Sequence, residues 1–204
     1  MENKKYKIIG LTGASGSGKT TASKKLINSI KPENILLISQ DSYYRDLNHL
    51  SLEKRNNQNF DHPDALDLKL LETHIKLLQM GIAIDSPIYN FNNHSREKKT
   101  KKIYPKKIII VEGTLVLSQD YLRPLFDMSI YLDLSQKKCL KRRIFRDINE
   151  RGRSMKSIKD QYEKTVRPMF EKFILPIKQI ADIVIPGVNN DKEISEIIKY
   201  LKEI

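Results

Sequence analysis

The chain contains almost no cysteine, no long apolar run and no compositionally biased segment. Cys139 is the one cysteine, so an intrachain disulfide is impossible and nothing indicates an oxidising compartment. Residues 1–7 lead directly into a strand-like segment without an apolar signal region, and no other stretch approaches the length of a membrane span. We find no internal repeat, low-complexity tract or proline-rich linker. At 204 residues the chain is too short for two ordinary domains, so we expect one domain over residues 1–204 and a cytoplasmic location.

The composition is that of a folded protein with a marked positive charge. Hydrophobic residues make up 39% of the chain and charged residues 30%, a globular balance rather than one typical of disorder. The formal net charge of +12 favours a polyanionic partner. Nucleic acid, anionic lipid and a nucleoside triphosphate all meet that description, so the distribution of the charges must decide among them.

Short apolar runs alternate along the chain with helical patterns. Strands are expected at residues 6–12, 35–39, 108–111, 129–132 and 183–185. Helices are expected at residues 20–30, 66–80, 135–150, 157–173 and 192–202. This alternation predicts an α/β fold with three layers, in which helices cover both faces of a five-stranded parallel sheet. Two further short strands, at residues 82–89 and 99–104, predict a small β-hairpin inserted at about residues 82–105.

The first expected strand leads into a glycine-rich loop. Its residues match the phosphate-loop pattern at every fixed position: Gly13, Ala14, Ser15, Gly16, Ser17, Gly18, Lys19 and Thr20. Such a loop curls so that its backbone N–H groups point at phosphate oxygens, and the following helix adds the partial positive charge of its N-terminus. Lys19 can then reach the β and γ phosphates, and the Thr20 hydroxyl can bind Mg²⁺. The alternative, a merely flexible turn, requires a chance match in the correct strand-to-helix context.

A phosphate loop binds a nucleotide without revealing what the nucleotide is for. A guanine-specific switch protein is expected to carry an Asn/Thr-Lys-x-Asp string, and none occurs in this chain. A motor or large ATPase would need a longer chain. Phosphoryl transfer to a small acceptor remains, and it requires a base, a metal ligand and cations that stabilise the transition state.

Two carboxylates follow expected strands. Gly13, Asp41 and Glu112 each come just after a different strand, so in a parallel sheet they are expected to meet in one crevice. Asp41 could take the proton of the acceptor hydroxyl or hold a metal-bound water, or it could simply cap a turn. Glu112 is the natural carboxylate for Mg²⁺ unless it is only the solvated end of its strand.

The helix expected at residues 135–150 belongs to a strongly basic stretch, with eight basic residues between positions 137 and 153. Leu140, Ile144 and Ile148 follow one another at intervals of four residues and predict its buried stripe. The cations would then occupy the other faces, and the helix would end near Gly152.

A helix that ends near Gly152 would leave Arg151 and Arg153 on a loop. An arginine-rich lid at about residues 146–156 could then fold over the triphosphate, exclude water and bring positive charge to the transferring phosphoryl group. We assign this role to Arg146 and Arg151, because a bidentate guanidinium suits phosphate. Three lysines are expected to be solvated: Lys137, Lys138 and Lys141.

Several segments together resemble the uridine/cytidine kinases, which are pyrimidine nucleoside kinases of the phosphoribulokinase-like group of P-loop kinases. The resemblance covers nearly the whole chain, in blocks at residues 13–21, 39–45, 59–67, 87–96, 111–113 and 143–153. It implies transfer of the γ-phosphoryl group of ATP, or of GTP, with Mg²⁺, to the 5′-hydroxyl of a pyrimidine ribonucleoside. The product would be UMP or CMP, in pyrimidine salvage. The family is often tetrameric with the hairpin in subunit contacts, so the resemblance also implies a homo-oligomer.

The resemblance assigns roles to individual residues. Asp61 and Arg143 would hold the ribose 2′ and 3′ hydroxyls, because a carboxylate accepts from a cis-diol and a guanidinium donates to it. The other implied residues of the nucleoside site are Tyr44 in the acceptor pocket, Tyr89 and His94 at the base, and Phe91, Arg153 and Gln161 beside them. The implied catalytic residues are Asp41, Lys19, Arg146 and Arg151. The implied metal ligands are Thr20, Glu112 and Asp41, and Thr21 completes the nucleotide loop.

Two other functions compete with nucleoside phosphorylation. A related kinase acting on pantothenate or a phosphorylated sugar would share the core but is expected to lack the base-reading and diol-binding residues. A nucleic-acid-binding ATPase would exploit the net charge and the basic run at residues 96–102. Aromatic residues are not interleaved with that run as a stacking platform would require, so it reads better as a solvated hairpin.

Overall fold

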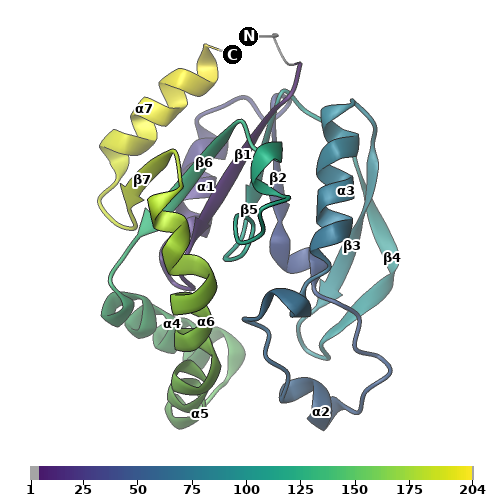
Figure 1. The fold of residues 1–204 in the computed structure, drawn as a ribbon, viewed down its shortest axis with the longest axis vertical. Helices are drawn as coiled ribbons and strands as arrows, with labels where there is room; N and C mark the ends of the chain where they lie inside the picture. Colours follow the sequence, from purple (N-terminus) through teal and green to yellow (C-terminus); the bar gives the residue numbers. More distant parts are fainter. Residues whose placement is uncertain (1–4, 204) are drawn as a thin grey trace.

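Five parallel strands form the centre of the computed structural model (Figure 1). They lie in the order β2-β5-β1-β6-β7. Their bounds are Lys7–Gly13 for β1, Ile35–Ser39 for β2, Ile108–Glu112 for β5, Met128–Asp133 for β6 and Ile183–Pro186 for β7. The predicted five-stranded parallel sheet is confirmed. The structure describes residues 5–203. The expectation that no signal region precedes the first strand rests partly on residues 1–4, which lie outside the described residues.

The strands are apolar on both faces because helices cover both faces of the sheet. Successive residues of β1 point to opposite sides, so Ile8 packs in one hydrophobic cluster and Ile9 in the other. Helices α1 (Lys19–Asn28) and α7 (Asp191–Lys202) bury their apolar side chains in the cluster that contains Ile9. The predicted three-layer arrangement is therefore confirmed.

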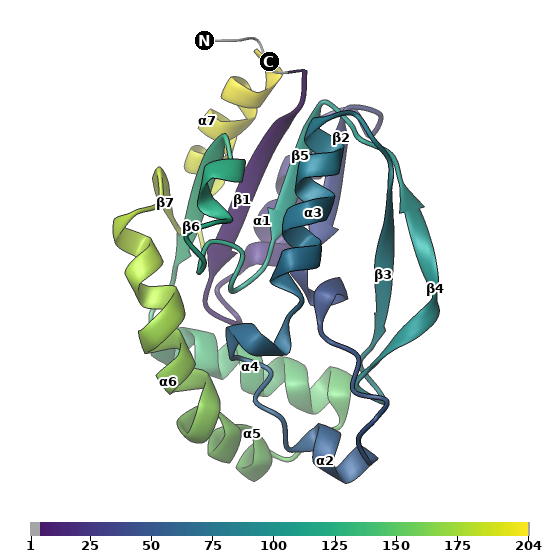
Figure 2. The same ribbon diagram turned by 45° about the vertical axis from the view of Figure 1, so that its right-hand side comes forward.

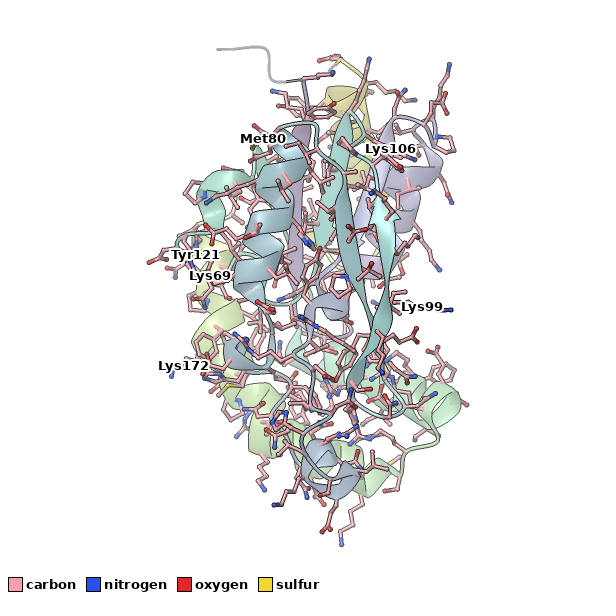
Figure 3. The ribbon with its side chains drawn as sticks, turned by 90° about the vertical axis from the view of Figure 1, so that its right-hand side faces the viewer. Lys69, Met80, Lys99, Lys106, Tyr121 and Lys172 are labelled. Atoms are coloured by element: carbon pink, nitrogen blue, oxygen red, sulfur yellow. The ribbon has the colours of Figure 1, made fainter. Side chains whose placement is uncertain are left out.

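The opposite face of the sheet is covered by α3 (Leu68–Gln79) and by the helical turns of residues 170–179, which precede β7. Asp67 begins α3, because its Oδ1 accepts a hydrogen bond from the N–H of Leu70 at 3.1 Å. Lys69 of α3 lies over the ring of Tyr121, 3.5 Å from its centroid (Figure 3). None of the helices in residues 5–203 combines the length and apolarity that crossing a membrane requires.

The remaining helices lie beyond the carboxyl ends of the strands (Figure 1). They are α2 (Leu52–Asn56), α4 (Gln136–Arg151) and α5 (Met155–Gln161). The carboxyl ends of the strands therefore face helices α2, α4 and α5.

The predicted hairpin is present as a separate two-stranded antiparallel sheet beside α3 (Figure 2). It consists of β3 (Ile84–Asn90) and β4 (Ser95–Ile103). The second strand of the hairpin was expected to start at residue 99, whereas β4 starts at Ser95. Most side chains of β4 are exposed, so its sequence shows no apolar alternation. Lys99 extends from β4 away from the body of the molecule (Figure 3).

The helix expected at residues 157–173 is present, but it is not a regular α-helix. Helix α5 ends at Gln161, and wider π-type turns follow at Tyr162–Val166 and Phe170–Ile174, on either side of the short α6 (Arg167–Met169). Pro168 lies within α6 and has no N–H to donate to the preceding turn, which disturbs the regular hydrogen-bond ladder.

The expected buried stripe of α4 is also wrong. The side of the helix facing the protein carries Cys139, Arg143 and Asp147, whereas Ile148 is 38% exposed. Two of these three residues are charged, because α4 packs over the carboxyl edge of the sheet rather than over the apolar core.

Candidate active site

The phosphate loop connects β1 to α1 at the carboxyl edge of the sheet. Gly18 is the N-cap of α1 with a left-handed φ of 110°, and the helix begins at Lys19. The ammonium of Lys19 donates hydrogen bonds to the carbonyl oxygens of Gly13 (2.9 Å) and Ala14 (3.0 Å). Its positive charge is thereby held across the loop, where phosphate oxygens would bind. Thr20 and Thr21 follow on the exposed side of the first helical turn.

A second loop supports the phosphate loop from outside. A Cβ atom on Gly18 would lie 2.6 Å from the carbonyl oxygen of Gly187, and one on Gly187 would collide with the carbonyl oxygen of Ser17. The two backbones can approach this closely only because both positions are glycine. Gly187 was not predicted from the sequence. No sequence pattern relates the loop after β7 to the start of α1, and only the fold brings them together.

Asp41 lies in the short 3₁₀ turn Gln40–Tyr43, directly after β2. The backbone N–H of Asp41 donates to Oγ of Ser39 at 3.4 Å, so Ser39 caps this turn. Within residues 5–203 the carboxylate of Asp41 makes no hydrogen bond or ion pair. This geometry does not support the alternative that Asp41 is itself the cap, and it leaves the carboxylate available to a ligand.

Asp41, Glu112 and Lys19 lie close enough to influence one another electrostatically. Asp41 keeps an exposed side, yet the protein packed around it removes enough water to raise its pKa, while Lys19, Arg151 and Arg146 oppose that shift. Burial likewise raises the pKa of Glu112, with Lys19 lowering it and Asp41 raising it further. Burial lowers the pKa of Lys19, and both carboxylates counteract this effect. The three groups therefore lie near one another.

The residues near the loop fit a magnesium ion that is held mainly by a nucleotide. Oε2 of Glu112 is buried and has no hydrogen-bond partner within the described residues, so it can serve as a metal ligand. Residues 5–203 include no group of three or more His, Cys, Asp or Glu side chains arranged to hold a metal. Mg²⁺ typically binds through one or two protein oxygens, phosphates and waters. Thr20 and Glu112 match that requirement, with Asp41 nearby.

Asp61 and Arg143 face each other on the acceptor side. Oδ1 of Asp61 lies 4.0 Å from Nη1 of Arg143, whose side chain is only 8% exposed. Burial raises the pKa of Asp61, and Arg143 opposes that effect most strongly. Gln161 orients the guanidinium by accepting from its Nη2 at 3.1 Å, and it also accepts from Nη1 of Arg153 at 2.6 Å. The two predicted diol-binding residues and their two predicted neighbours thus form one connected group.

An aromatic cluster continues from this pair toward the hairpin. The ring centroid of Tyr44 lies 5.6 Å from that of Phe60 and 5.1 Å from that of Tyr89. Phe60 stacks on His94 at 4.5 Å, and Tyr89 contacts the half-exposed Phe91 at 5.2 Å. The hydroxyl of Tyr89 is buried without a hydrogen-bond partner among residues 5–203, so it is available to a polar group of a ligand. Phe60 was missed from the sequence, where its only signal was its place next to Asp61.

His94 occupies a strained position at the tip of the hairpin. Its φ is 50°, in the left-handed region that few non-glycine residues adopt. Burial lowers its pKa, and Arg55 and Arg151 lower it further, which favours the neutral ring. A neutral imidazole has one donor and one acceptor nitrogen, as recognition of a base edge requires.

Arg146, Arg151 and Arg153 lie at the end of α4. Arg151 is the last residue of the helix and Gly152 terminates it with a φ of 62°, so the expectation that Arg151 lies on a loop is wrong. Nη1 of Arg151 lies 3.6 Å from Oδ1 of Asp147 one turn earlier, and a cation is also favoured by the helix dipole at this end. Arg153 lies just beyond the helix, as expected.

Known proteins share this architecture and much of the sequence. The model of the phosphoribulokinase/uridine kinase family matches residues 8–194. A uridine kinase from Escherichia fergusonii is 47% identical over 196 residues, 94% of this chain and 92% of its own. A uridine kinase from Shewanella sp. ANA-3 is 44% identical over 203 residues, covering 98% and 96%.

A solved structure shows the same fold at lower sequence similarity. Phosphoribulokinase from Rhodobacter spheroides superposes with a TM-score of 0.68 at 17% identity, over 90% of this chain and 71% of its own. The full-length sequence matches and the phosphate-loop architecture agree, and they confirm the resemblance inferred from the six sequence blocks. The chain belongs to the phosphoribulokinase/uridine kinase family.

Proposed function

We propose that this chain is a uridine/cytidine kinase, which transfers the γ-phosphoryl group of a nucleoside triphosphate to the 5′-hydroxyl of a pyrimidine ribonucleoside. The observation that carries this assignment is the match to proteins named uridine kinase at 42–47% identity, which extends through the phosphate loop and the acceptor side alike. The position of Asp41 supports it, because Asp41 interacts electrostatically with both Lys19 of the phosphate loop and Tyr44, and a catalytic base must lie near both donor and acceptor.

The chemistry follows from this placement. Asp41 takes the proton of the 5′-hydroxyl as that oxygen attacks the γ-phosphorus, and the bond to the bridging oxygen breaks to release the nucleoside diphosphate. Lys19, Arg146 and Arg151 stabilise the charge on the transferring group. Thr20 and Glu112 would hold Mg²⁺, which supplies further charge neutralisation when bound. Asp61 and Arg143 fix the ribose, so the 5′-oxygen is presented in one orientation.

The acceptor side favours a nucleoside over pantothenate or a phosphorylated sugar. The Asp61 carboxylate and the Arg143 guanidinium match the acceptor and donor needs of a ribose cis-diol. Tyr44, Tyr89 and Phe60 offer aromatic surface to a base, and neutral His94 offers a hydrogen-bonding edge. The nucleic-acid alternative has no comparable support, because the exposed basic side chains of β4 have no aromatic residues between them.

Several finer assignments belong to the same proposal and rest on the family resemblance. ATP or GTP serves as the donor with Mg²⁺, the product enters pyrimidine salvage, and the enzyme works in the cytoplasm as a homotetramer with the β3–β4 hairpin at subunit contacts. The chain forms one kinase domain, in which residues 146–156 act as the lid.

Chromatographic detection of products tests the assignment. Purified protein is incubated with Mg·ATP and, separately, uridine, cytidine, adenosine, pantothenate and ribulose 5-phosphate, with Lys19→Ala as a control for contaminating kinases. We expect UMP, CMP or both, together with ADP. We expect no phosphorylated product from adenosine, pantothenate or ribulose 5-phosphate. Absence of UMP and CMP from the wild-type reaction would contradict the proposal.

A further inference from the structure

One buried carboxylate lies at the centre of the lid arginines. Asp147 of α4 is 0% exposed, although a carboxylate is rarely buried completely. Its Oδ1 lies 2.9 Å from Nε and 2.8 Å from Nη2 of Arg146, and 3.6 Å from Nη1 of Arg151. Its Oδ2 lies 3.7 Å from Nε of Arg143 and 3.5 Å from Nη1 of Arg153. We call the four guanidinium groups around Asp147 the arginine array.

The arginine array joins the two halves of the active site. Arg143 and Arg153 meet at Gln161 on the nucleoside side, where Arg143 also faces Asp61. The other two members reach the catalytic side, since both lower the pKa of Asp41. Asp147 is therefore the side chain that the nucleoside-binding and the catalytic arginines have in common.

Electrostatics explains why such a centre is needed. Four guanidinium groups within a few ångströms repel one another, and without an anion between them they would separate into solvent. A single carboxylate holds them together but cannot neutralise them, so the array keeps a net positive charge for an incoming anion. A buried charge is tolerated only with this kind of pairing.

The backbone of Asp147 adds a geometric constraint. Its carbonyl oxygen accepts the capping N–H at Gly152 and the N–H of Arg153, the latter at 3.0 Å. The residue thus fixes both the end of α4 and the guanidinium groups on either side of that end.

We propose that Asp147 is a positioning residue, which sets the arginine array in place before the substrates bind. This inference rests on the proposed function. Because Asp147 holds Arg146 and Arg151 together before the triphosphate binds, little reorganisation is needed at the moment of reaction. Asp147 does not contact the reacting atoms; it acts through the arginines.

A double-mutant cycle separates this role from a merely structural one. Asp147→Asn keeps the side-chain shape and removes the charge, and we expect kcat for uridine to fall at least tenfold. In an Arg146→Ala background the same substitution is expected to lower kcat by a smaller factor than in the wild type, because one of the arginines through which it acts is gone. Asp120→Asn is the matched control: it breaks a surface Asp–Arg pair at Arg123, and its kcat is expected to be that of the wild type. Unchanged kcat in Asp147→Asn, or equal losses in both backgrounds, would overturn the proposal.

A measurement on the wild-type protein covers the case in which Asp147→Asn does not fold. Arginine Nε–H signals are recorded by ¹⁵N NMR without ligand, with Arg146 assigned through Arg146→Lys. We expect slow hydrogen exchange at Nε of Arg146, because Asp147 holds it, and a shift of the signal on adding a nonhydrolysable ATP analogue. A rapidly exchanging Nε–H in the unliganded protein contradicts the proposal. Failure of the proposed function is recognised separately, since the wild-type protein would then make neither UMP nor CMP.

Discussion

Oδ1 of Asp61 faces Nη1 of Arg143 across 4.0 Å, at the outer limit of an ion pair. At this separation the two groups attract each other without forming a short hydrogen bond that a ligand would first have to break. Each therefore retains hydrogen-bonding capacity, the carboxylate as acceptor and the guanidinium as donor. A cis-diol can use both at once.

Removal of the Asp61 carboxylate is expected to weaken binding of ribonucleosides specifically. Asp61→Ala should raise the KM for uridine by about 10- to 100-fold, the loss of a charged hydrogen bond. It should also abolish discrimination between uridine and 2′-deoxyuridine, because the carboxylate that senses the diol is gone. Initial rates on both nucleosides measure this, with the KM for ATP as internal control. A preserved preference for the ribonucleoside would remove Asp61 from the ribose site.

Neutralisation of Asp41 is expected to affect the chemical step and leave nucleotide binding intact. Asp41→Asn keeps the size of the side chain but cannot accept the proton, so kcat should fall about 100-fold or more. Titration with a fluorescent ATP analogue should give a Kd close to that of the wild type. If the variant turned over uridine at the wild-type rate, Asp41 would be only part of the turn at the end of β2.

The close approach of Gly187 to the phosphate loop is expected to matter for nucleotide affinity. In Gly187→Ala the added methyl group collides with the carbonyl oxygen of Ser17, so the phosphate loop must shift. We expect the KM for ATP to rise about tenfold or more, with a smaller effect on the KM for uridine. A KM for ATP equal to that of the wild type would show that the β7–α7 loop yields instead.

Stability at mildly acidic pH is expected to depend on His74. Nδ1 of His74 lies 2.9 Å from the buried hydroxyl of Tyr43. Burial lowers the pKa of His74, with Arg96 acting in the same direction and Asp85 and Asp67 opposing it. The unfolded chain therefore takes up a proton below about pH 6.5 that the folded chain does not, and stability falls as the pH is lowered through that range.

Thermal unfolding of His74→Gln tests this dependence. The decrease in Tm between about pH 7.5 and about pH 5.5 should be smaller than in the wild type, because the unfolded variant has one histidine fewer to protonate. The exposed His49, changed to Gln, is the control and should follow the wild type. Equal pH dependence in all three proteins would rule out His74 as a source of acid sensitivity.

Local patterns predicted the framework well. The phosphate loop was predictable because all its fixed positions are consecutive, and its glycines and Lys19 act within one strand-to-helix connection. The apolar runs predicted the sheet, since strands buried on both faces leave a strong signal. β4 was placed less well, because an exposed strand has no such signal.

The proposed acceptor site was predictable only through resemblance to relatives. Tyr89 and His94 lie in the hairpin, whereas Phe60 lies in the segment before α3, and nothing in the sequence spacing connects Phe60 with the other two. The folding of the hairpin against the segment that precedes α3 brings Phe60 and His94 into stacking contact. Sequence periodicity describes neighbours along one element and is silent about such pairs.

The sequence by itself determined the sheet, the phosphate loop and the carboxylates at the strand ends, because local hydrophobic pattern and backbone conformation specify these features. The tertiary structure alone decided which face of α4 is covered. Hydrophobicity favoured Leu140, Ile144 and Ile148, but the helix lies over a charged site and turns Arg143 and Asp147 inward. The reason is that a buried ion group is stable only where its partners surround it in space, and those partners are brought together by the fold.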